Sequence, residues 1–466
     1  MTTSTLQQPT APALADTLRS RRQRLSQLID FPVLLWSGTA KPRNFTANIY
    51  PYRASSHFLY FAGLPLENAA IRIEGQQLTL FMDNTSPDDA LWHGPTPSRD
   101  EIATQIGATE AYPLDQLAEI SGVATLGEQD ETVQMLERFM LQRGIVLSRH
   151  RPQGNQDFEK ALVKVRMIQD EGAIAAMRHA IAVSVHAHKA GMAATHAART
   201  EAQVRAAMEA VITSNNMDCA YGSIVTIAGE VLHNHHYHNA INPGDLLLAD
   251  VGAETARGWA SDITRTWPVS GAFSATQRDI YDIVLAAHDF CIEKAKAGEE
   301  YAYIHQVACH IIAAGLVELG ILNGSPTDLV EQDAHALFFP HGVGHLMGLD
   351  VHDMEDLGDL SGYAEGRDRS DRFGLAFLRL NRPLEVGMAV TIEPGFYQVP
   401  AILNDPKNRD RYADMVNWER LAEFSDVRGI RIEDDILITP QGNEVLSQAL
   451  PTAANAIEEL VREGWE

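Results

Sequence analysis

The chain has 466 residues, of which 45% are hydrophobic and 21% are charged, the composition of an ordinary globular protein. This length exceeds one average domain, so we expect two or three domains. The formal net charge of −25 argues against nucleic acid or another polyanion as a partner. The three cysteines show no CxxC or paired spacing, which is typical of a reducing compartment and excludes a disulfide framework.

The N-terminal segment lacks the marks of an export signal. Its sequence, MTTSTLQQPTAPALADTLRSRRQ, contains no apolar stretch followed by a small-residue cleavage site. No run in the chain approaches the ~20 apolar residues that span a bilayer. We therefore expect a soluble, cytoplasmic protein that does not associate with membranes.

The first 155 residues are predicted to form an α/β domain. A helix is expected over residues 14–28 and another near 129–142. Short apolar runs between turn residues indicate strands at 31–36, 58–63, 69–75 and 77–82, with a further apolar run at 144–148. The turn-rich segment 151–157 ends in Asp157, which could cap a following helix, so we place the domain boundary between 155 and 156.

The second predicted domain covers residues 156–466. Apolar residues at three- and four-residue spacings predict a helix that continues for some thirty residues from Phe158. Further helices are expected at 201–214, 275–297 and 303–320. Apolar strand-like runs fall between these groups of helices, as expected for an α+β domain. The segment from Met354 to Leu384 is rich in Arg and Asp and is expected to be a loop.

Five residues of this domain form a candidate metal centre. Asp250 ends the apolar run LLLAD, Asp262 lies in SDITRTW, and Glu393 ends AVTIE. His345 lies among glycines in HGVGHLMG, and Glu433 lies in GIRIEDD. Four carboxylates and one imidazole form an oxygen-rich set suited to divalent cations. Two such ions can activate a bridging water, so the set predicts a dinuclear metallohydrolase.

Each of these residues, taken singly, also has a structural interpretation. A buried Asp beside a strand can cap a turn, and Arg431 and Glu433 share one strand face and could form an ion pair. Buried ion pairs stabilise poorly, however, because desolvation offsets the Coulomb gain. Several acidic residues beside β-rich runs therefore favour a functional site.

Histidines cluster in two places near these acidic residues. The segment 338–353 holds His341, His345 and His352 among glycines, and imidazole can bind metal or transfer protons. The run HNHHYH at 233–238 has four histidines that cannot all reach one centre. We expect His233 to face the site, because an apolar pair precedes it, and the other three to be solvated. The histidines between 179 and 196 lie on a predicted helix without carboxylate partners, so we expect them to be structural.

These segments resemble the proline-specific metallopeptidases of pita-bread fold, prolidase and aminopeptidase P. The resemblance is strong over residues 160–450, where all five ligand positions occur in the family's order. It is weaker over the first 150 residues, in which YRASSHFLYFAG resembles an FRQ-type segment of the family's N-terminal domain. It implies an α+β protein, with a pita-bread catalytic domain at 156–466 and a smaller, non-catalytic α/β domain at 1–155.

The resemblance also implies a role for each site residue. Two divalent ions, manganese or else cobalt or zinc, would be bound by Asp250, Asp262, His345, Glu393 and Glu433. Substrate and transition state would be contacted by His233, His341 and His352, with Arg431 supporting the site and Tyr221 near the ligands. The interval from Asp250 to Asp262 is one residue longer than the family's, so we expect a bulge in that hairpin. Phe396 and Tyr397, just after Glu393, are candidates for a shallow apolar proline pocket.

Two activities are open to such an enzyme. Arg379, fourteen residues before Glu393, matches the prolidase arginine that captures a substrate's C-terminal carboxylate. A solvated arginine on a charged loop is the alternative, and Arg382 lies nearby. The charged insert and the long stretch 398–428 also resemble prolidase. We predict hydrolysis of Xaa-Pro dipeptides, with aminopeptidase P activity on longer peptides as the alternative, and we expect a homodimer or homotetramer.

Three other classes fit less well. A binding protein on the same fold would be expected to lack metal ligands, and none is missing. A methionine aminopeptidase shares the five ligands but usually has no N-terminal domain of this size. A metal-free, creatinase-like hydrolase does not account for the complete ligand set.

Overall fold

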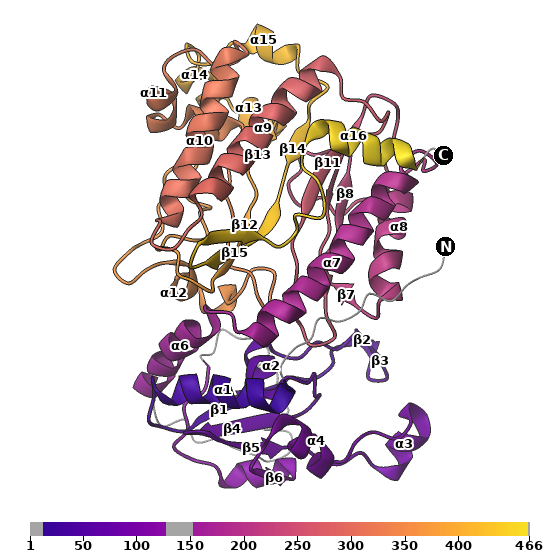
Figure 1. Ribbon diagram of the computed structural model, residues 1–466, viewed down its shortest axis with the longest axis vertical. Coiled ribbons are helices and arrows are strands. Elements are labelled where there is room, and N and C mark those ends of the chain that lie inside the picture. Colours follow the sequence, from indigo (N-terminus) through magenta and orange to yellow (C-terminus); the bar gives the residue numbers. More distant parts are fainter. Residues whose placement is uncertain (1–12, 127–151, 465–466) are drawn as a thin grey trace.

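A computed structural model of the chain describes residues 13–126 and 152–464. Figure 1 shows a small N-terminal part and a larger part that contains the remaining strands and long helices. Helix α6 (Pro152–Arg166) lies between them in sequence and contacts α1 (Leu14–Ser26) of the small part. The predicted boundary between 155 and 156 falls in the first turn of α6 and stays a prediction. The helix predicted at 129–142 and the run at 144–148 lie outside the described residues.

The small part is built on a four-stranded sheet of order β1-β4-β5-β6, antiparallel except for the pair β5 and β6. Its elements after α1 are β1 (Val33–Trp36), β2 (Pro42–Phe45), β3 (Asn48–Ile49), α2 (Ser56–Ala62), β4 (Ala70–Glu74), β5 (Gln77–Phe81), α3 (Pro87–His93), α4 (Arg99–Ile106), β6 (Glu110–Tyr112) and η1 (Leu114–Glu119). The strands predicted at 31–36, 69–75 and 77–82 are therefore confirmed.

The prediction of a strand at 58–63 is wrong, because residues 58–62 belong to helix α2. Every residue of α2 is buried, so it shows no polar face that would mark a helix. A short apolar run of this kind fits a buried strand and a buried helix equally well. Gly63 ends the helix with a φ of 68°, a left-handed conformation that glycine adopts without strain.

Most of the helices in the described residues belong to the larger part or, like α6, lead into it. They are α6, α7 (Glu171–Ala194), α8 (Glu201–Ser214), α9 (Ala275–Lys294), α10 (Tyr301–Glu318), α11 (Pro326–Glu331), η2 (Ala334–Leu337), η3 (Glu355–Leu357), α12 (Asp359–Gly362), α13 (Pro400–Leu403), α14 (Pro406–Arg411), α15 (Trp418–Ala422) and α16 (Ala454–Glu463). The helix predicted to continue from Phe158 is two helices. The Asp170 side chain caps α7 by accepting from the backbone N–H of Ala173, at 2.9 Å, which starts a new helix there.

The strands of this part form short antiparallel sheets between the helices. They are β7 (Asp218–Cys219), β8 (Ile224–Thr226), β9 (Leu246–Asp250), β10 (Ala253–Glu254), β11 (Thr264–Pro268), β12 (Ala389–Ile392), β13 (Gly395–Tyr397), β14 (Gly429–Arg431), β15 (Asp434–Thr439) and β16 (Gly442–Val445). One sheet has the order β11-β9-β8 and another β12-β15-β16. A bridge between Thr264 and Glu433 joins them. Helix α8 contacts β7 and β8, whereas α9 contacts β12, β13 and β14 (Figure 1).

The hairpin between β9 and β11 is regular. Thr264 pairs with Asp250, and Ala260 pairs with Glu254 in the same register further out. A bulge would shift the register between these two pairs. The predicted bulge is therefore wrong, and the residues between 254 and 260 form the turn.

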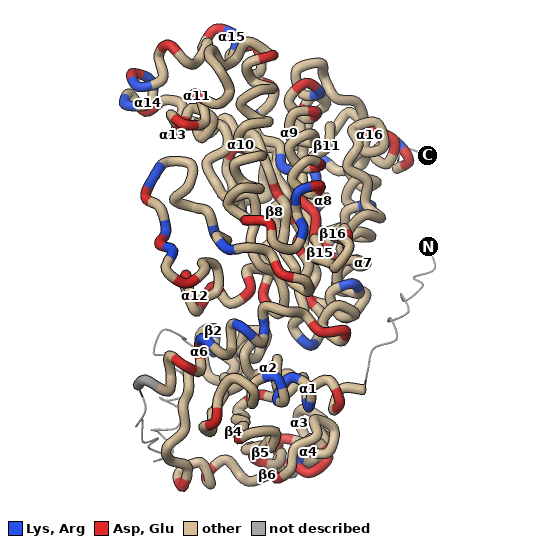
Figure 2. The backbone as a smooth tube through the Cα atoms, turned by 60° about the vertical axis from the view of Figure 1, so that its left-hand side comes forward, with Lys and Arg blue, Asp and Glu red and all other residues tan. Residues whose placement is uncertain are grey.

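The two parts share buried core and buried charge. One cluster of buried apolar residues includes Phe58 of α2 together with Met177 of α7 and Trp259 of the hairpin turn. Arg21 and Arg24 of α1 donate to Asp170, at 2.7 and 3.1 Å. Figure 2 shows basic positions of this kind where the two parts meet. Among the described residues no helix combines the length and apolarity needed to cross a membrane.

Candidate active site

Three carboxylates meet where β8, β9 and β11 end. The buried strand β9 ends at Asp250, which pairs with Ile224 on β8 and with Thr264 on β11. Asp262 lies just before β11, and the bridge to Thr264 brings Glu433 alongside. One oxygen from each of Asp250, Asp262 and Glu433 lies within 4.8 Å of the others, and all three residues are buried. Sheet pairing therefore gathers acidic residues that are 183 positions apart in sequence.

The fourth carboxylate and the imidazole arrive from the other sheet. The backbone N–H of Thr391 donates to the carbonyl of His345, at 3.0 Å, and that of Glu393 donates to Val343, at 2.8 Å. This pairing aligns the His345 segment with β12. Ligand atoms of His345, Glu393 and Glu433 lie within 4.8 Å of one another. All five predicted ligands are thus brought together around one centre.

The electrostatics of this centre favour divalent cations. Burial, with repulsion from Asp250, raises the pKa of Asp262 to about 7, and burial raises that of Glu393 to about 7. The pKa of Glu433 is raised well above its usual value by burial and then by Asp262. The buried Arg431 lies 2.6 Å from Asp250, and its positive charge partly offsets the negative charge of the other three carboxylates. Oxygen donors with so little compensating positive charge suit hard divalent ions.

Arg431 and Tyr221 organise the carboxylates. Arg431 donates through Nη2 to Asp250 and through Nε to Thr264 Oγ1, at 3.1 Å. The Tyr221 hydroxyl lies 2.6 Å from an oxygen of Asp250 and 2.6 Å from an oxygen of Asp262. A phenol has one proton, so it donates to one of these carboxylates at a time. The structure therefore places Tyr221 against two of the predicted ligands.

Tyr397 connects Arg431 to His341. Arg431 Nη1 lies 3.1 Å from the Tyr397 hydroxyl, which lies 2.9 Å from His341 Nε2. His341 Nδ1 lies 2.7 Å from the carbonyl of Gly342, so Nδ1 carries the ring proton and Nε2 accepts. Burial and the nearby Arg431 charge lower the pKa of His341 to about 3, so its ring is neutral at neutral pH.

His352 lies beside the predicted metal ligands, and its ring nitrogen, with ligand atoms of Asp262 and His345, forms a further group within 4.8 Å. Its ring contacts the ring of His345 edge-on, with centroids 4.2 Å apart. Its Nδ1 lies 3.3 Å from Glu355, and Glu355 also accepts two hydrogen bonds from Arg379, at 2.6 and 2.7 Å. Although burial opposes it, hydrogen bonding and charge from His352 and Arg379 lower the pKa of Glu355 to about 2. Sequence analysis did not identify Glu355, which stands in a charged segment without a distinguishing motif.

A cavity of about 340 Å³ opens over these groups. Its wall includes the five predicted ligands together with Leu232, His233, Pro340, His341, Gly342, His352, Phe377, Arg379, Ile402 and Arg431. The residues predicted for the proline pocket do not line it. Phe396 is buried and stacks on Phe338, with ring centroids 5.3 Å apart, and Tyr397 lies behind His341. The apolar side chains of Leu232, Pro340, Phe377 and Ile402 take this place, and their scattered positions gave no sequence signal.

The histidines at 233–238 and His188 lie where the sequence analysis placed them, but the reason given for His233 is wrong. His233 lines the cavity, but the apolar pair before it does not anchor it, since Val231 is 48% exposed. His235, His236 and His238 are exposed. On helix α7, His188 is buried with Nε2 3.1 Å from the carbonyl of Val251. It contributes to none of the groups that could hold a metal.

Comparison with known proteins identifies the family. The sequence model of metallopeptidase family M24 matches residues 175–440, and the model of the aminopeptidase P N-terminal domain matches residues 18–133. The chain belongs to metallopeptidase family M24. This metallopeptidase is 30% identical over 444 residues to the Xaa-Pro aminopeptidase of Haemophilus influenzae, an alignment that covers 92% of this chain and 93% of that protein.

Solved structures agree with the sequence relatives. The metallopeptidase superposes on aminopeptidase P of Escherichia coli, solved with the inhibitor Pro-Leu, with a TM-score of 0.78 and 27% identity over 97% of this chain and 99% of that one. The aminopeptidase PepP of Pseudomonas aeruginosa gives a TM-score of 0.78 and 27% identity, with coverage of 98% and 99%.

These comparisons confirm the predicted fold and enzyme class. The chain is a metallopeptidase that depends on divalent metal ions, with a pita-bread catalytic domain behind an aminopeptidase P N-terminal domain. They support the predicted alternative, an Xaa-Pro aminopeptidase, better than the Xaa-Pro dipeptidase that we predicted first.

Proposed function

We propose that this metallopeptidase is an Xaa-Pro aminopeptidase, which removes the N-terminal residue from peptides whose second residue is proline. Relatives and solved structures of that activity match nearly the whole chain, and this observation carries the proposal. The dipeptidase prediction depended on Arg379 as a free carboxylate receptor. Two short hydrogen bonds to Glu355 already compensate that arginine's charge.

Two divalent ions, manganese with cobalt or zinc as substitutes, are proposed for the five-ligand centre. Asp250, Asp262 and Glu433 would hold one, and His345, Glu393 and Glu433 the other, following two of the three groups of donor atoms that lie within 4.8 Å of one another; the third group is Asp262, His345 and His352. When bound, the ions would lower the pKa of a coordinated water and polarise the scissile carbonyl. Their positive charge would also compensate carboxylates that otherwise repel one another.

We propose a division of labour among the other cavity residues. Glu393 lies at the cavity wall and is the carboxylate placed to accept a proton from the attacking water and to return it to the leaving nitrogen. His233 and His352 line the cavity and are proposed to donate towards the carbonyl oxygen as it gains negative charge. Because Glu355 accepts from Nδ1 of His352, Nε2 of His352 has a proton to donate when the ring is an imidazolium. His341, which burial and the Arg431 charge keep neutral and which the Tyr397 hydroxyl orients, also lines the cavity and would contact the substrate. Proline has no amide N–H, so the apolar side chains at the cavity wall would recognise its ring rather than a hydrogen bond.

A peptide panel tests the proposed function. The protein is chelated, reloaded with Mn²⁺, and assayed on Ala-Pro, Ala-Pro-Ala and Ala-Ala-Ala. We expect metal-dependent release of alanine from Ala-Pro-Ala, with a higher kcat/KM than for Ala-Pro and none from Ala-Ala-Ala. A higher kcat/KM for Ala-Pro would restore the dipeptidase assignment.

A pair of matched variants tests the metal centre in the same assay. Asp262→Asn should lose bound metal and nearly all activity, because a carboxylate ligand becomes a weaker neutral donor. Asp279→Asn makes the same change at an exposed position on α9 and should have no effect on either. Full activity of the chelated protein would refute a metal-dependent reaction.

A further inference from the structure

We infer that the N-terminal domain positions His352. Arg53 and the first two residues of α2, Ser56 and His57, hold the segment 349–356 on the side away from the cavity. The inference rests on the proposed function, because that function assigns His352 to the reaction. It makes these three residues positioning residues for chemistry that the catalytic domain performs.

The segment 349–356 has little secondary structure of its own. It follows His345 in the chain and consists of bends and turns up to Met354, and its last two residues begin the short helix η3. Met354 has a φ of 61°, a conformation that side chains other than glycine adopt at a cost. The backbone N–H of Asp353 donates to the carbonyl of Leu346, at 3.0 Å, and Leu346 forms a bridge with Val390 of β12. A segment of this kind depends on outside contacts for a fixed geometry.

Arg53 and Ser56 contact the start of the segment. The Ser56 hydroxyl donates to Asp350 Oδ1 at 2.6 Å and accepts from Arg53 Nη1 at 2.8 Å. Arg53 Nη2 donates to the backbone carbonyl of Leu349 and lies 3.3 Å from Asp350. These contacts fix the backbone three residues before His352.

His57 and Arg166 hold the other end through a buried chain. Arg166 Nη2 lies 2.6 Å from Asp353, the residue after His352, and its Nη1 lies 2.6 Å from His57 Nδ1. Arginine can only donate, so His57 accepts at Nδ1 and carries its proton on Nε2, which lies 2.8 Å from Asp356. His57, Arg166 and Asp353 are each at most 3% exposed. Buried ion pairs add little stability, so a role in fixing geometry accounts for this chain better.

Arg53 also contacts the hairpin between the predicted ligands Asp250 and Asp262. Arg53 Nε lies 2.8 Å from Glu254, on the strand β10 of that hairpin. In the turn, Gly258 has a φ of 85°, and a Cβ added there would lie 2.8 Å from Leu59 of α2 and 3.4 Å from Leu349. Arg53 is therefore the point where α2, the hairpin and the His352 segment meet.

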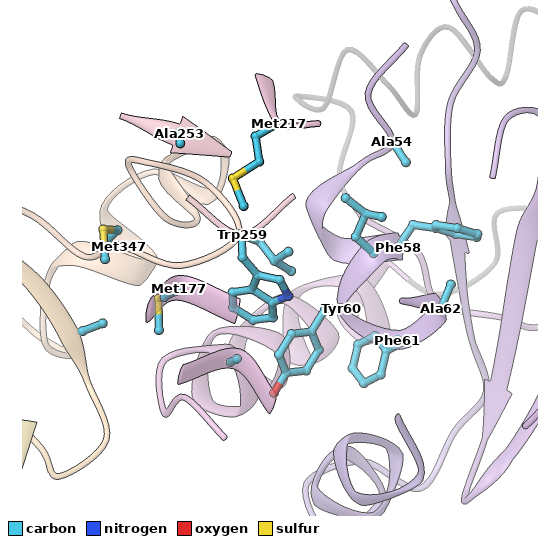
Figure 3. Packing of buried hydrophobic residues seen from close by; sticks show 14 of the residues in the cluster. Ala54, Phe58, Tyr60, Phe61, Ala62, Met177, Met217, Ala253, Trp259 and Met347 are labelled. Carbon is cyan, nitrogen blue, oxygen red and sulfur yellow. The ribbon is translucent and has the colours of Figure 1, made fainter. Parts of the chain in front are cut away.

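Aromatic side chains pack the hairpin turn against α2 beside this junction. Figure 3 shows Trp259 of the hairpin turn next to Tyr60 of α2. The Arg21 guanidinium lies over both rings, 4.4 Å from the centroid of Tyr60 and 5.2 Å from that of Trp259. The hairpin and α2 are therefore packed against each other, and Arg53 connects this packed pair to Leu349 and Asp350.

The test compares variants of this junction with a matched surface arginine. Arg53→Ala removes every contact of the side chain, and Ser56→Ala removes the hydrogen bond to Asp350 with little change in volume. Arg72→Ala is the control, since Arg72 lies in the same domain and pairs with the partly exposed Glu74. For each protein we would measure kcat and KM on Ala-Pro-Ala, bound Mn²⁺, and hydrogen exchange of residues 349–356.

We expect Arg53→Ala to lower kcat about 10- to 100-fold, the range for loss of a supporting contact. KM and bound Mn²⁺ should stay within about 2-fold, because the ligands are held by the sheets, and exchange in 349–356 should rise. Ser56→Ala should show the same pattern with a smaller effect and serves as the test if Arg53→Ala does not fold. For the buried chain, His57→Gln keeps one donor and one acceptor and should retain more kcat than His57→Ala.

Three results would overturn the inference. They are unchanged kcat and exchange in both Arg53→Ala and Ser56→Ala, loss of metal in proportion to activity, and an equal fall in kcat for Arg72→Ala. If the unmodified protein fails to cleave Ala-Pro-Ala, the proposed function fails. The exchange data then still decide whether the N-terminal domain fixes the segment 349–356.

Discussion

The sharpest prediction concerns the pH dependence of the metal-free protein. In the folded state the pKa of Asp262 is raised from 3.8 to about 7, because the carboxyl is buried beside Asp250. A raised pKa stabilises the fold fully below the unfolded-state pKa, and this contribution is lost as pH rises through about 7. Asp262→Asn replaces the carboxyl with a neutral group of the same shape. The advantage of the variant over the unmodified protein should therefore grow with pH.

The size of the effect follows from these two pKa values. Linkage for one group that titrates near 3.8 unfolded and about 7 folded predicts a change of about 2 kcal/mol between pH 5.5 and 8. Neutral buried histidines act in the opposite direction. His341, whose pKa is lowered to about 3, favours folding more as pH rises through 6.5. Comparing the two proteins at each pH cancels this contribution, because both contain the same histidines.

The assay is urea unfolding of chelated protein, followed by tryptophan fluorescence at several pH values. We expect the free energy of unfolding of Asp262→Asn to exceed that of the unmodified protein by a margin about 2 kcal/mol larger at pH 8 than at pH 5.5. Saturating Mn²⁺ should reverse the order at pH 8, since the ion compensates the carboxylates and needs them ionised. A margin that stays constant or shrinks as pH rises would refute the electrostatic account of the centre.

Three further predictions address single contacts. Glu355→Gln should raise the ratio of kcat/KM for Ala-Pro to that for Ala-Pro-Ala, because Arg379 becomes free to bind a terminal carboxylate; an unchanged ratio would show that Glu355 does not restrain it. Tyr397→Phe should lower turnover roughly 10-fold while leaving bound Mn²⁺ unchanged, since two buried partners lose a hydrogen bond worth ~1–3 kcal/mol; metal loss would contradict this. Arg431→Met should lower the free energy of unfolding of the metal-free protein by ~3–5 kcal/mol, because Asp250 becomes an uncompensated buried charge. The loss should be smaller with Mn²⁺ bound, and equal losses with and without metal would argue against compensation by the ion.

The sequence by itself predicted the five residues that form the candidate metal centre. Asp250, Asp262, His345, Glu393 and Glu433 stand at the ends of apolar runs or among glycines, so their local surroundings already mark them as unusual. The sequence also predicted helices at 201–214, 275–297 and 303–320, which correspond to α8, α9 and α10. Local pattern suffices in these places because an acidic residue in a buried strand, or a periodic helix, is visible within a few residues.

The tertiary structure alone decided which of these residues act together and what supports them. Glu355 compensates Arg379 only because the chain folds back across 24 positions. The apolar run at 58–62 is a helix, but its sequence has no polar face and fits a buried strand equally well, so only the tertiary structure decided between the two. Arg53 reaches Leu349 across 296 positions. Such contacts depend on distances between segments that the chain fixes only by folding, so no local pattern can reveal them.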